Sequence, residues 1–152
     1  MTMKTVRNAL TAFAAAALLA TALVPAGAAE FEVKMLNKGE KGAMVFEPEI
    51  VRAAPGDTVK FVPTDKGHNA ESVEGMYPDG ATPFKGVLNK EITVTFDKEG
   101  VYGIRCKPHY GLGMVMLVEV GSPVNAEAAK AAKAPKKAKI KFEELFAELD
   151  NQ

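Results

Sequence analysis

Cysteine and histidine are scarce in this sequence. Cys106 is the only cysteine among 152 residues, and His68 and His109 are the only histidines. A single cysteine excludes an intramolecular disulfide. An excess of charge of one sign is also lacking, because 19 basic residues balance 19 acidic ones. That balance excludes a general attraction to nucleic acid or to a membrane surface, so any electrostatic steering must come from a local patch.

Residues 1–28 have the pattern of a cleaved export signal. Lys4 and Arg7 give a positive start, an apolar stretch follows from Ala9 to Val24, and Ala26-Gly27-Ala28 is a small-residue cleavage pattern. We predict cleavage after residue 28 and a periplasmic protein. The alternative is a membrane anchor, which the alanine-rich composition and the adjacent cleavage pattern disfavour. The remaining chain carries 17 basic against 19 acidic residues and has no other apolar run long enough to span a bilayer.

An unpaired cysteine is unusual in an exported chain. Outside the cytoplasm a free thiol is a liability unless it is buried, paired between two chains or bound to a metal. Cys106 is therefore the first indication of function.

Residues 29–121 are predicted to form one β-rich domain. Turn signals such as Pro55-Gly56-Asp57 separate short segments of alternating apolar and polar residues. Such strands at this spacing favour an antiparallel sandwich or a Greek-key barrel. No helical period occurs before residue 121, although the loop-like segment 67–89 could hold a short helical turn around 70–75. The predicted strands are Phe31–Leu36, Ile50–Ala54, Thr58–Pro63, Glu91–Phe96, Val101–Cys106 and Met114–Val120.

Residues 122–152 are predicted to be a helical extension packed on the same domain. Asn125 is a candidate cap for a helix over 126–133, which Pro135 ends. A second helix over 140–149 places four large apolar side chains at helical spacing, and we expect this stripe to pack on the strands. Its acidic residues disfavour a membrane-surface helix. The stripe consists of Phe142, Leu145, Phe146 and Leu149.

The motif Cys-x2-His-x4-Met carries the chemistry. It places Cys106, His109 and Met114 on one loop between the last two predicted strands, while His68 follows an earlier strand. Gly111 and Gly113 permit the tight turns that let these side chains converge. Pro108 stiffens the loop and limits hydrogen bonds near the sulfur.

A thiolate, two imidazoles and a distant thioether suit a copper ion that cycles between Cu(II) and Cu(I). A trigonal site of two histidines and one cysteine with a weak axial methionine lies between the preferences of the two oxidation states, so little has to move when an electron arrives. We therefore predict one copper ion per chain, with ligands His68, Cys106, His109 and Met114, and an electron-transfer role without catalysis. Met116 is assigned to the core.

Other functions fit the residues less well. Zinc binds cysteine and histidine, but methionine is an unusual fourth ligand for it. A catalytic copper oxidoreductase would need a second site with further histidines, and none remain. A cysteine–histidine hydrolase would need a reachable thiolate, which is disfavoured for a sulfur under a ligand loop.

These residues resemble the cupredoxins. The similarity includes the Cys-x2-His-x4-Met loop, the pair His68-Asn69 and the strand pattern, and the two C-terminal helices make the chain similar to the pseudoazurin branch of that family. The resemblance implies an all-β fold, an eight-stranded Greek-key sandwich with two C-terminal α-helices and copper near one end. It also implies that Asn69 forms hydrogen bonds beside the thiolate, and that Tyr102 belongs to the Greek-key corner.

The resemblance further implies that electrons pass through the exposed edge of His109. Around it we expect an apolar patch of Met44, Pro108, Leu112 and Gly113. A ring of lysines would direct this face toward an acidic partner. By the same resemblance, a nitrite reductase is the expected acceptor and a c-type cytochrome a candidate donor, and we expect a monomer. The lysines are Lys38, Lys66, Lys85, Lys107 and Lys137.

Overall fold

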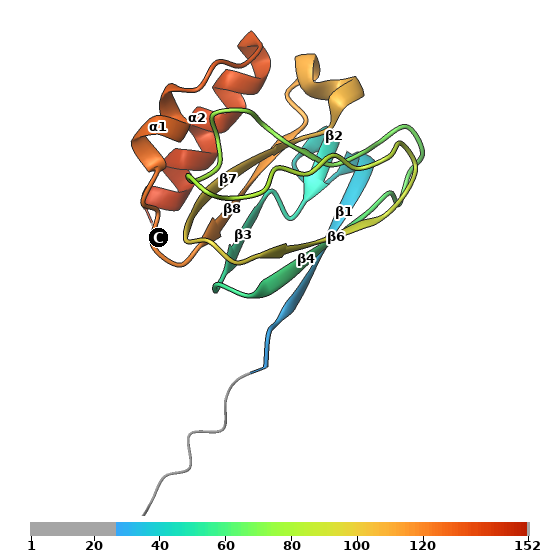
Figure 1. The fold of residues 1–152 in the computed structure, drawn as a ribbon. Helices are drawn as coiled ribbons and strands as arrows, with labels where there is room; N and C mark the ends of the chain where they lie inside the picture. Colours follow the sequence, from blue (N-terminus) through green and yellow to red (C-terminus); the bar gives the residue numbers. More distant parts are fainter. Residues whose placement is uncertain (1–26, 152) are drawn as a thin grey trace, which may run out of the picture.

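The computed structural model describes residues 27–151, which form eight strands, one 3-10 helix and two α-helices. The export signal predicted for residues 1–28 lies outside the described residues except for its last two, so it stays a prediction. The strands form two four-stranded sheets that face each other (Figure 1). The predicted eight-stranded sandwich with C-terminal helices is therefore confirmed.

Each sheet contains one parallel pair of strands, so the sandwich is mixed rather than wholly antiparallel. In the first sheet β1 runs parallel to β4, and in the second β3 runs parallel to β8. The order in the first sheet is β2 (Gly42–Glu47), β1 (Glu30–Gly39), β4 (Asp57–Val62) and β6 (Ile92–Phe96). The order in the second is β3 (Ile50–Ala53), β8 (Val115–Val120), β7 (Gly100–Arg105) and β5 (Glu71–Ser72).

The main core lies between the sheets and follows the alternation of the strands. In β4, Val59 and Phe61 are completely buried while their neighbours are only half-buried. Phe61 stacks on Phe84 with ring centroids 5.7 Å apart and meets Phe46 edge-on. Burying an aromatic or branched side chain contributes about 1.5–3 kcal/mol. The Greek-key corner is closed by Tyr102, whose hydroxyl donates to the carbonyl of Lys98 at 2.8 Å.

The beginning of β4 is fastened to the beginning of β1 through Asp57. Its carboxylate accepts the N–H of Ala29 at 2.7 Å and the N–H of Ala54 at 2.8 Å. These two backbone hydrogen bonds hold the pKa of Asp57 below its usual value.

The expectation of a helical turn around 70–75 is wrong. Glu71 and Ser72 form β5 and pair with Arg105 and Ile104 of β7. The buried side chain of Glu71 finds its charged partner, Arg105, across this pair, which a local helical turn would not provide. Although no helical period is seen before residue 121, Lys107–Leu112 forms a 3-10 helix, η1, with a proline in its first turn.

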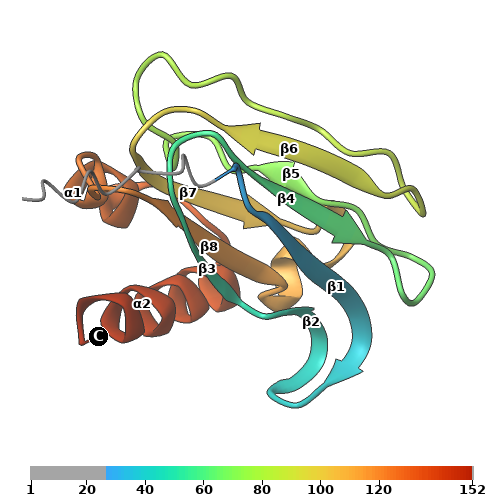
Figure 2. The same cartoon turned by 90° about the horizontal axis from the view of Figure 1, so that it is seen from below.

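Two helices cover the outer face of the second sheet (Figures 1 and 2). They are α1 (Ala126–Ala131) and α2 (Lys136–Asp150). The four members of the predicted apolar stripe are all buried in a second core against β7 and β8, so that prediction is confirmed. Pro135 immediately precedes α2, whereas α1 ends four residues before it. No helix within residues 27–151 has the length and apolarity needed to cross a membrane.

Asn125 precedes α1, but its side chain does not cap the helix as predicted. Its Oδ1 accepts the N–H of Val101 at 2.7 Å and its Nδ2 donates to the carbonyl of Val101 at 2.9 Å. Because β7 occupies both ends of the amide, the side-chain oxygen of Asn125 is not available to the N–H groups at the start of the helix.

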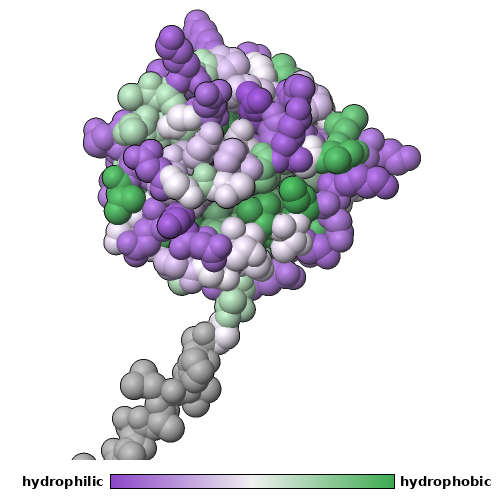
Figure 3. Space-filling view, viewed as in Figure 1, coloured by the Kyte–Doolittle hydropathy of each residue, from purple (hydrophilic) through white to green (hydrophobic). Residues whose placement is uncertain are grey.

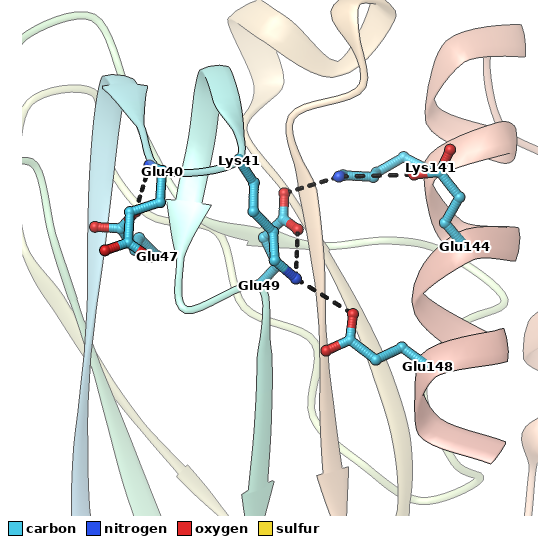
Figure 4. A network of polar contacts seen from close by, with 7 residues as sticks. All are labelled: Glu40, Lys41, Glu47, Glu49, Lys141, Glu144 and Glu148. Carbon is cyan, nitrogen blue, oxygen red and sulfur yellow. Dashed lines mark hydrogen bonds and ion pairs between the residues drawn. The ribbon is translucent and has the colours of Figure 1, made fainter. Parts of the chain in front are cut away.

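A buried carboxylate fastens α2 to the segment between β2 and β3 (Figure 4). Glu49 is almost fully buried, and its Oε1 lies 3.0 Å from Nζ of Lys141 in α2. Its Oε2 lies 3.6 Å from Nζ of Lys41, which also contacts Glu148 at 3.2 Å. A charge removed from water in this way must be paired, so the network fixes the position of α2 against the sandwich.

Candidate metal centre

The predicted ligands meet at one end of the sandwich. His68 follows β4, Cys106 follows β7, His109 lies in η1 and Met114 immediately precedes β8. In Figure 1 the short orange helix at the top is η1, and this end is opposite the end at which β1 begins. The structure therefore brings together residues that are 38 positions apart.

Three donor atoms converge closely enough to share one ion. Nδ1 of His68 lies 3.6 Å from Sγ of Cys106, and Nδ1 of His109 lies 3.5 Å from the same sulfur. All three donor atoms lie within 4.8 Å of one another. Ligands about 2.1 Å from an ion in a trigonal plane are separated by about 3.6 Å. The donor set therefore fits a trigonal metal site of one sulfur and two nitrogens.

Met114 lies beside this group, completely buried. The N–H of Cys106 donates to its carbonyl at 3.0 Å, and its own N–H donates to the carbonyl of His109 at 3.2 Å. These two bonds close the loop, and Gly113, with a φ of 90°, makes the turn before Met114. Met116 is also completely buried and belongs to the main core, as predicted.

Asn37 orients the ring of His68. Its Oδ1 lies 2.9 Å from Nε2 of His68. An amide oxygen only accepts, so Nε2 carries the proton and Nδ1 keeps its lone pair for the metal. The N–H of Asn37 in turn donates to Asp65 at 2.7 Å. Sequence reasoning missed Asn37, because an asparagine 31 positions before a histidine gives no local signal.

The environment favours neutral forms of His68 and Cys106 in the metal-free protein. Burial, and next the nearby His109, lower the pKa of His68, while Asp65 opposes them. Burial raises the pKa of the Cys106 thiol, against hydrogen bonds from the backbone N–H groups of Asn69 and His109. A neutral imidazole is ready to bind a metal, but the thiol must release its proton.

The side chain of Asn69 connects the two ligand segments. Its Oδ1 accepts the N–H of Lys107, the residue after Cys106, at 2.8 Å. Its Nδ2 donates to the carbonyl of Gly86 at 3.0 Å and to Glu71 at 3.2 Å. Asn69 thus lies where the resemblance implied, between the His68 strand end and the thiolate loop.

The predicted docking residues differ in exposure. His109 is half-buried, Pro108 and Leu112 are exposed, and Met44 and Gly113 are half-buried. On the face shown in Figure 3, hydrophobic side chains form small groups between hydrophilic ones. All five predicted lysines are exposed, and none forms an ion pair with another described residue between 27 and 151.

Two apolar residues that sequence reasoning missed lie beside the thiolate loop. Val87 is 67% exposed and Leu88 is 48% exposed. Together with Pro108 they line a groove between Lys85 and Lys107. They lie in the segment 67–89, whose loop-like pattern gave no reason to expect a surface.

Comparison with known proteins decides the family. Residues 33–121 match the model of "Copper binding proteins, plastocyanin/azurin family". The chain is 54% identical to a pseudoazurin from Paracoccus pantotrophus over 140 residues, which cover 91% of this chain and 96% of that one. The chain belongs to the pseudoazurins. A pseudoazurin from Methylorubrum extorquens is 51% identical over 143 residues, covering 93% and 97% of the two chains. The solved structure of a Sinorhizobium pseudoazurin superposes with a TM-score of 0.79 at 50% identity, covering 80% of this chain and 97% of that one.

Membership of the pseudoazurins establishes the cofactor and the class of activity. The chain binds one copper ion and is an electron carrier of blue-copper type, not an enzyme. The zinc module and the cysteine–histidine hydrolase weighed from the sequence are therefore set aside.

Proposed function

We propose that His68, Cys106, His109 and Met114 hold the copper ion of a monomeric periplasmic carrier. It receives electrons from a c-type cytochrome and delivers them singly to a nitrite reductase. The convergence of two Nδ1 atoms and one Sγ carries this proposal. Residues 29–121 form the copper-binding part, and residues 122–152 are an extension packed on the same domain.

The protein keeps the donor atoms in place in both oxidation states. Bound copper supplies the Cu(II)/Cu(I) couple. Asn37 holds the ring of His68, and the loop bonds of Met114 hold Cys106 and His109. Because the ligands belong to a rigid sandwich and are themselves hydrogen-bonded, an arriving electron causes little rearrangement.

His109 is the port for the electron. Its ring is half-buried, whereas His68, Cys106 and Met114 are buried. A partner that docks over Pro108 and Leu112 therefore approaches the copper most closely through the edge of this imidazole. A small contact of this kind suits two proteins that must separate quickly.

The docking face combines the apolar residues with unpaired positive charge. The five lysines have no acidic partner among the described residues, so their charge is available to an acidic surface. The groove of Val87, Leu88 and Pro108 extends the apolar contact to one side of His109.

Reconstitution of the metal-free protein with one equivalent of Cu(II) tests the ligand set. We expect an intense visible thiolate-to-copper band that a reductant bleaches reversibly. Cys106→Ala should abolish the band and Met114→Leu should shift the reduction potential. The matched variant Met116→Leu, which changes a core thioether, should shift it little. A colourless complex with one bound metal would contradict the assignment.

Charge reversal tests the docking face. Lys38→Glu and Lys137→Glu should slow electron transfer to a purified copper nitrite reductase at low salt, and the difference should fade as ionic strength rises. Lys98→Glu is the control, because Lys98 is exposed, has no acidic partner among the described residues and lies near the Greek-key corner. Rates that respond equally to all three reversals, or to none, would remove the proposed face.

A further inference from the structure

Glu71 is a buried carboxylate near the copper loop, and it is not one of the proposed copper ligands. It lies in β5 and is only 3% exposed. Its Oε1 accepts a hydrogen bond from Nε of Arg105 at 2.8 Å and forms an ion pair with an Nη atom of the same residue at 2.7 Å. Its Oε2 accepts a hydrogen bond from Nδ2 of Asn69 at 3.2 Å. Each carboxylate oxygen thus has a different partner: Arg105 immediately precedes Cys106, and Asn69 immediately follows His68.

The contact with Glu71 is one of three hydrogen bonds that fix which way the amide of Asn69 faces. Nδ2 donates to two acceptors, Glu71 and the carbonyl of Gly86, while Oδ1 accepts the N–H of Lys107. With the amide turned over, its oxygen would face two other oxygens and its NH2 group would face an N–H donor. Glu71 therefore favours the single orientation in which the oxygen is available to Lys107.

The orientation of Asn69 matters for the sulfur of Cys106. Lys107 is bonded to Cys106, so the hydrogen bond from its N–H fixes the backbone immediately after the ligand. The backbone N–H of Asn69 also hydrogen-bonds to the sulfur itself. Hydrogen bonds around a ligating thiolate tune the reduction potential of copper.

We propose that Glu71 is a positioning residue for the copper loop, which it holds through the side-chain amide of Asn69. Its effect on the reduction potential rests on the proposed copper site, whereas its effect on the backbone of Lys107 rests on hydrogen bonding alone.

The simpler alternative is that Glu71 only clamps two strands. Glu71 and Arg105 are register partners in β5 and β7, so their ion pair links these strands directly. The variant Arg105→Leu distinguishes the two roles, because it removes the ion pair but leaves the hydrogen bond between Glu71 and Asn69. If Glu71 only clamps the strands, removing Glu71 or Arg105 should have the same effect on the copper loop. If Glu71 positions Asn69, only the removal of Glu71 should affect the loop.

Amide hydrogen exchange in the metal-free protein tests this difference. We expect Glu71→Leu to increase the exchange rate at Lys107 by about tenfold, because a hydrogen bond that a charged group supports is weakened. In Arg105→Leu the rate should stay near that of the native protein. The amide of Val59, in the other sheet, reports global unfolding, which loss of the buried pair promotes in both variants, so exchange at Lys107 is judged relative to Val59 in the same variant. Equal rates at Lys107 in the two variants would overturn the proposal.

A second substitution covers the case in which Glu71→Leu does not fold. Glu71→Gln keeps the shape of the side chain, but its one oxygen cannot accept from both Arg105 and Asn69. The same increase at Lys107 is expected, and an unchanged rate would count against the proposal.

The reduction potential of the copper-loaded protein is the second readout. The double variant Glu71→Leu/Arg105→Leu removes a pair with no net charge, so a through-space charge effect largely cancels. A weaker N–H···S bond leaves more electron density on sulfur and stabilises Cu(II), so the potential should fall. The matched double variant Arg52→Leu/Glu119→Leu removes an exposed cross-strand pair with a 2.7 Å contact and should leave the potential unchanged. Equal potentials in both double variants would contradict the proposal, and a native protein without the blue band would contradict the copper site instead.

Discussion

Asn37 and His68 are 31 residues apart in the chain, yet Oδ1 of Asn37 lies 2.9 Å from Nε2 of His68. This contact joins β1 of the first sheet to the metal-binding end of the molecule. It leaves Nδ1, the nitrogen that faces Cys106, as the only ring atom free to bind copper.

Replacing Asn37 should weaken copper binding without abolishing it. In Asn37→Leu the ring of His68 loses its only acceptor at Nε2 among the described residues, and loss of such a partner typically lowers metal affinity 10–100-fold. Asn37→Asp keeps an acceptor and adds negative charge, so it should retain affinity and lower the reduction potential by stabilising Cu(II). Competition with a chelator measures the affinity, and equal affinities in the two variants would contradict this role.

The metal-free protein should be most stable between the two titrations of its ligands. The pKa of His68 is lowered from 6.5, so as pH falls below about 6.5 the unfolded state takes up the proton first and the free energy of unfolding decreases. The pKa of Cys106 is raised from 9.0, so above about pH 9 the unfolded thiol ionises first and stability again decreases.

Urea denaturation at a series of pH values measures both effects. His68→Gln should flatten the acid side of the stability profile, and Cys106→Ala should flatten the alkaline side. A variant whose profile stays parallel to that of the native protein would exclude the corresponding group.

Gly113→Ala should destabilise both the fold and the copper loop. Gly113 has a φ of 90°, and an added Cβ would lie 3.3 Å from the carbonyl oxygen of Lys137 in α2. A non-glycine residue in such a conformation costs about 1–3 kcal/mol. Gly111→Ala is the matched control in the same loop, because its Cβ would have no neighbour within 4 Å and its φ is not positive. Chemical denaturation and the position of the visible band give the comparison, and equal losses in the two variants would argue against this explanation.

Breaking the buried pair of Glu49 and Lys141 should loosen α2. Removing one member of a buried ion pair costs about 3–5 kcal/mol, and we expect the lower end because Lys41 also contacts Glu49. Lys141→Met is the test. Glu148→Gln, which removes an exposed member of the same network, should cost less than about 1 kcal/mol. Denaturation and hydrogen exchange in α2 report the outcome, and similar costs for the two substitutions would contradict the burial argument.

The copper ligands could be predicted from the sequence because they are rare and mostly local. Three of the four lie within one short motif, and His68 was the only other histidine available. The residues that support them could not be predicted in this way. Asn37 and Glu71 act through contacts that the folded sheets create, and neither belongs to a recognisable motif.

The strands were predicted where burial on one side gives alternation, as in β4 and β6. The pattern fails for β5, which has two residues and is specified by pairing with β7 rather than by its own sequence. Asn125 shows the same limitation for caps, because a strand competes with the helix for its amide. Local preference gives way where a tertiary partner offers a better hydrogen bond.

The hydrogen bond between Ala29 and Asp57 has a consequence for maturation. If the export signal is removed after residue 28, the nitrogen that donates to Asp57 ceases to be an amide and becomes the terminal ammonium of the processed chain. The contact at 2.7 Å then becomes an ion pair between the first residue and the beginning of β4. Proteolysis would therefore strengthen an existing bond, and the added stability would disappear above the pKa of an α-amino group, about 8. After such a cleavage, the carboxylate of Asp57 would already be positioned to receive the new terminus.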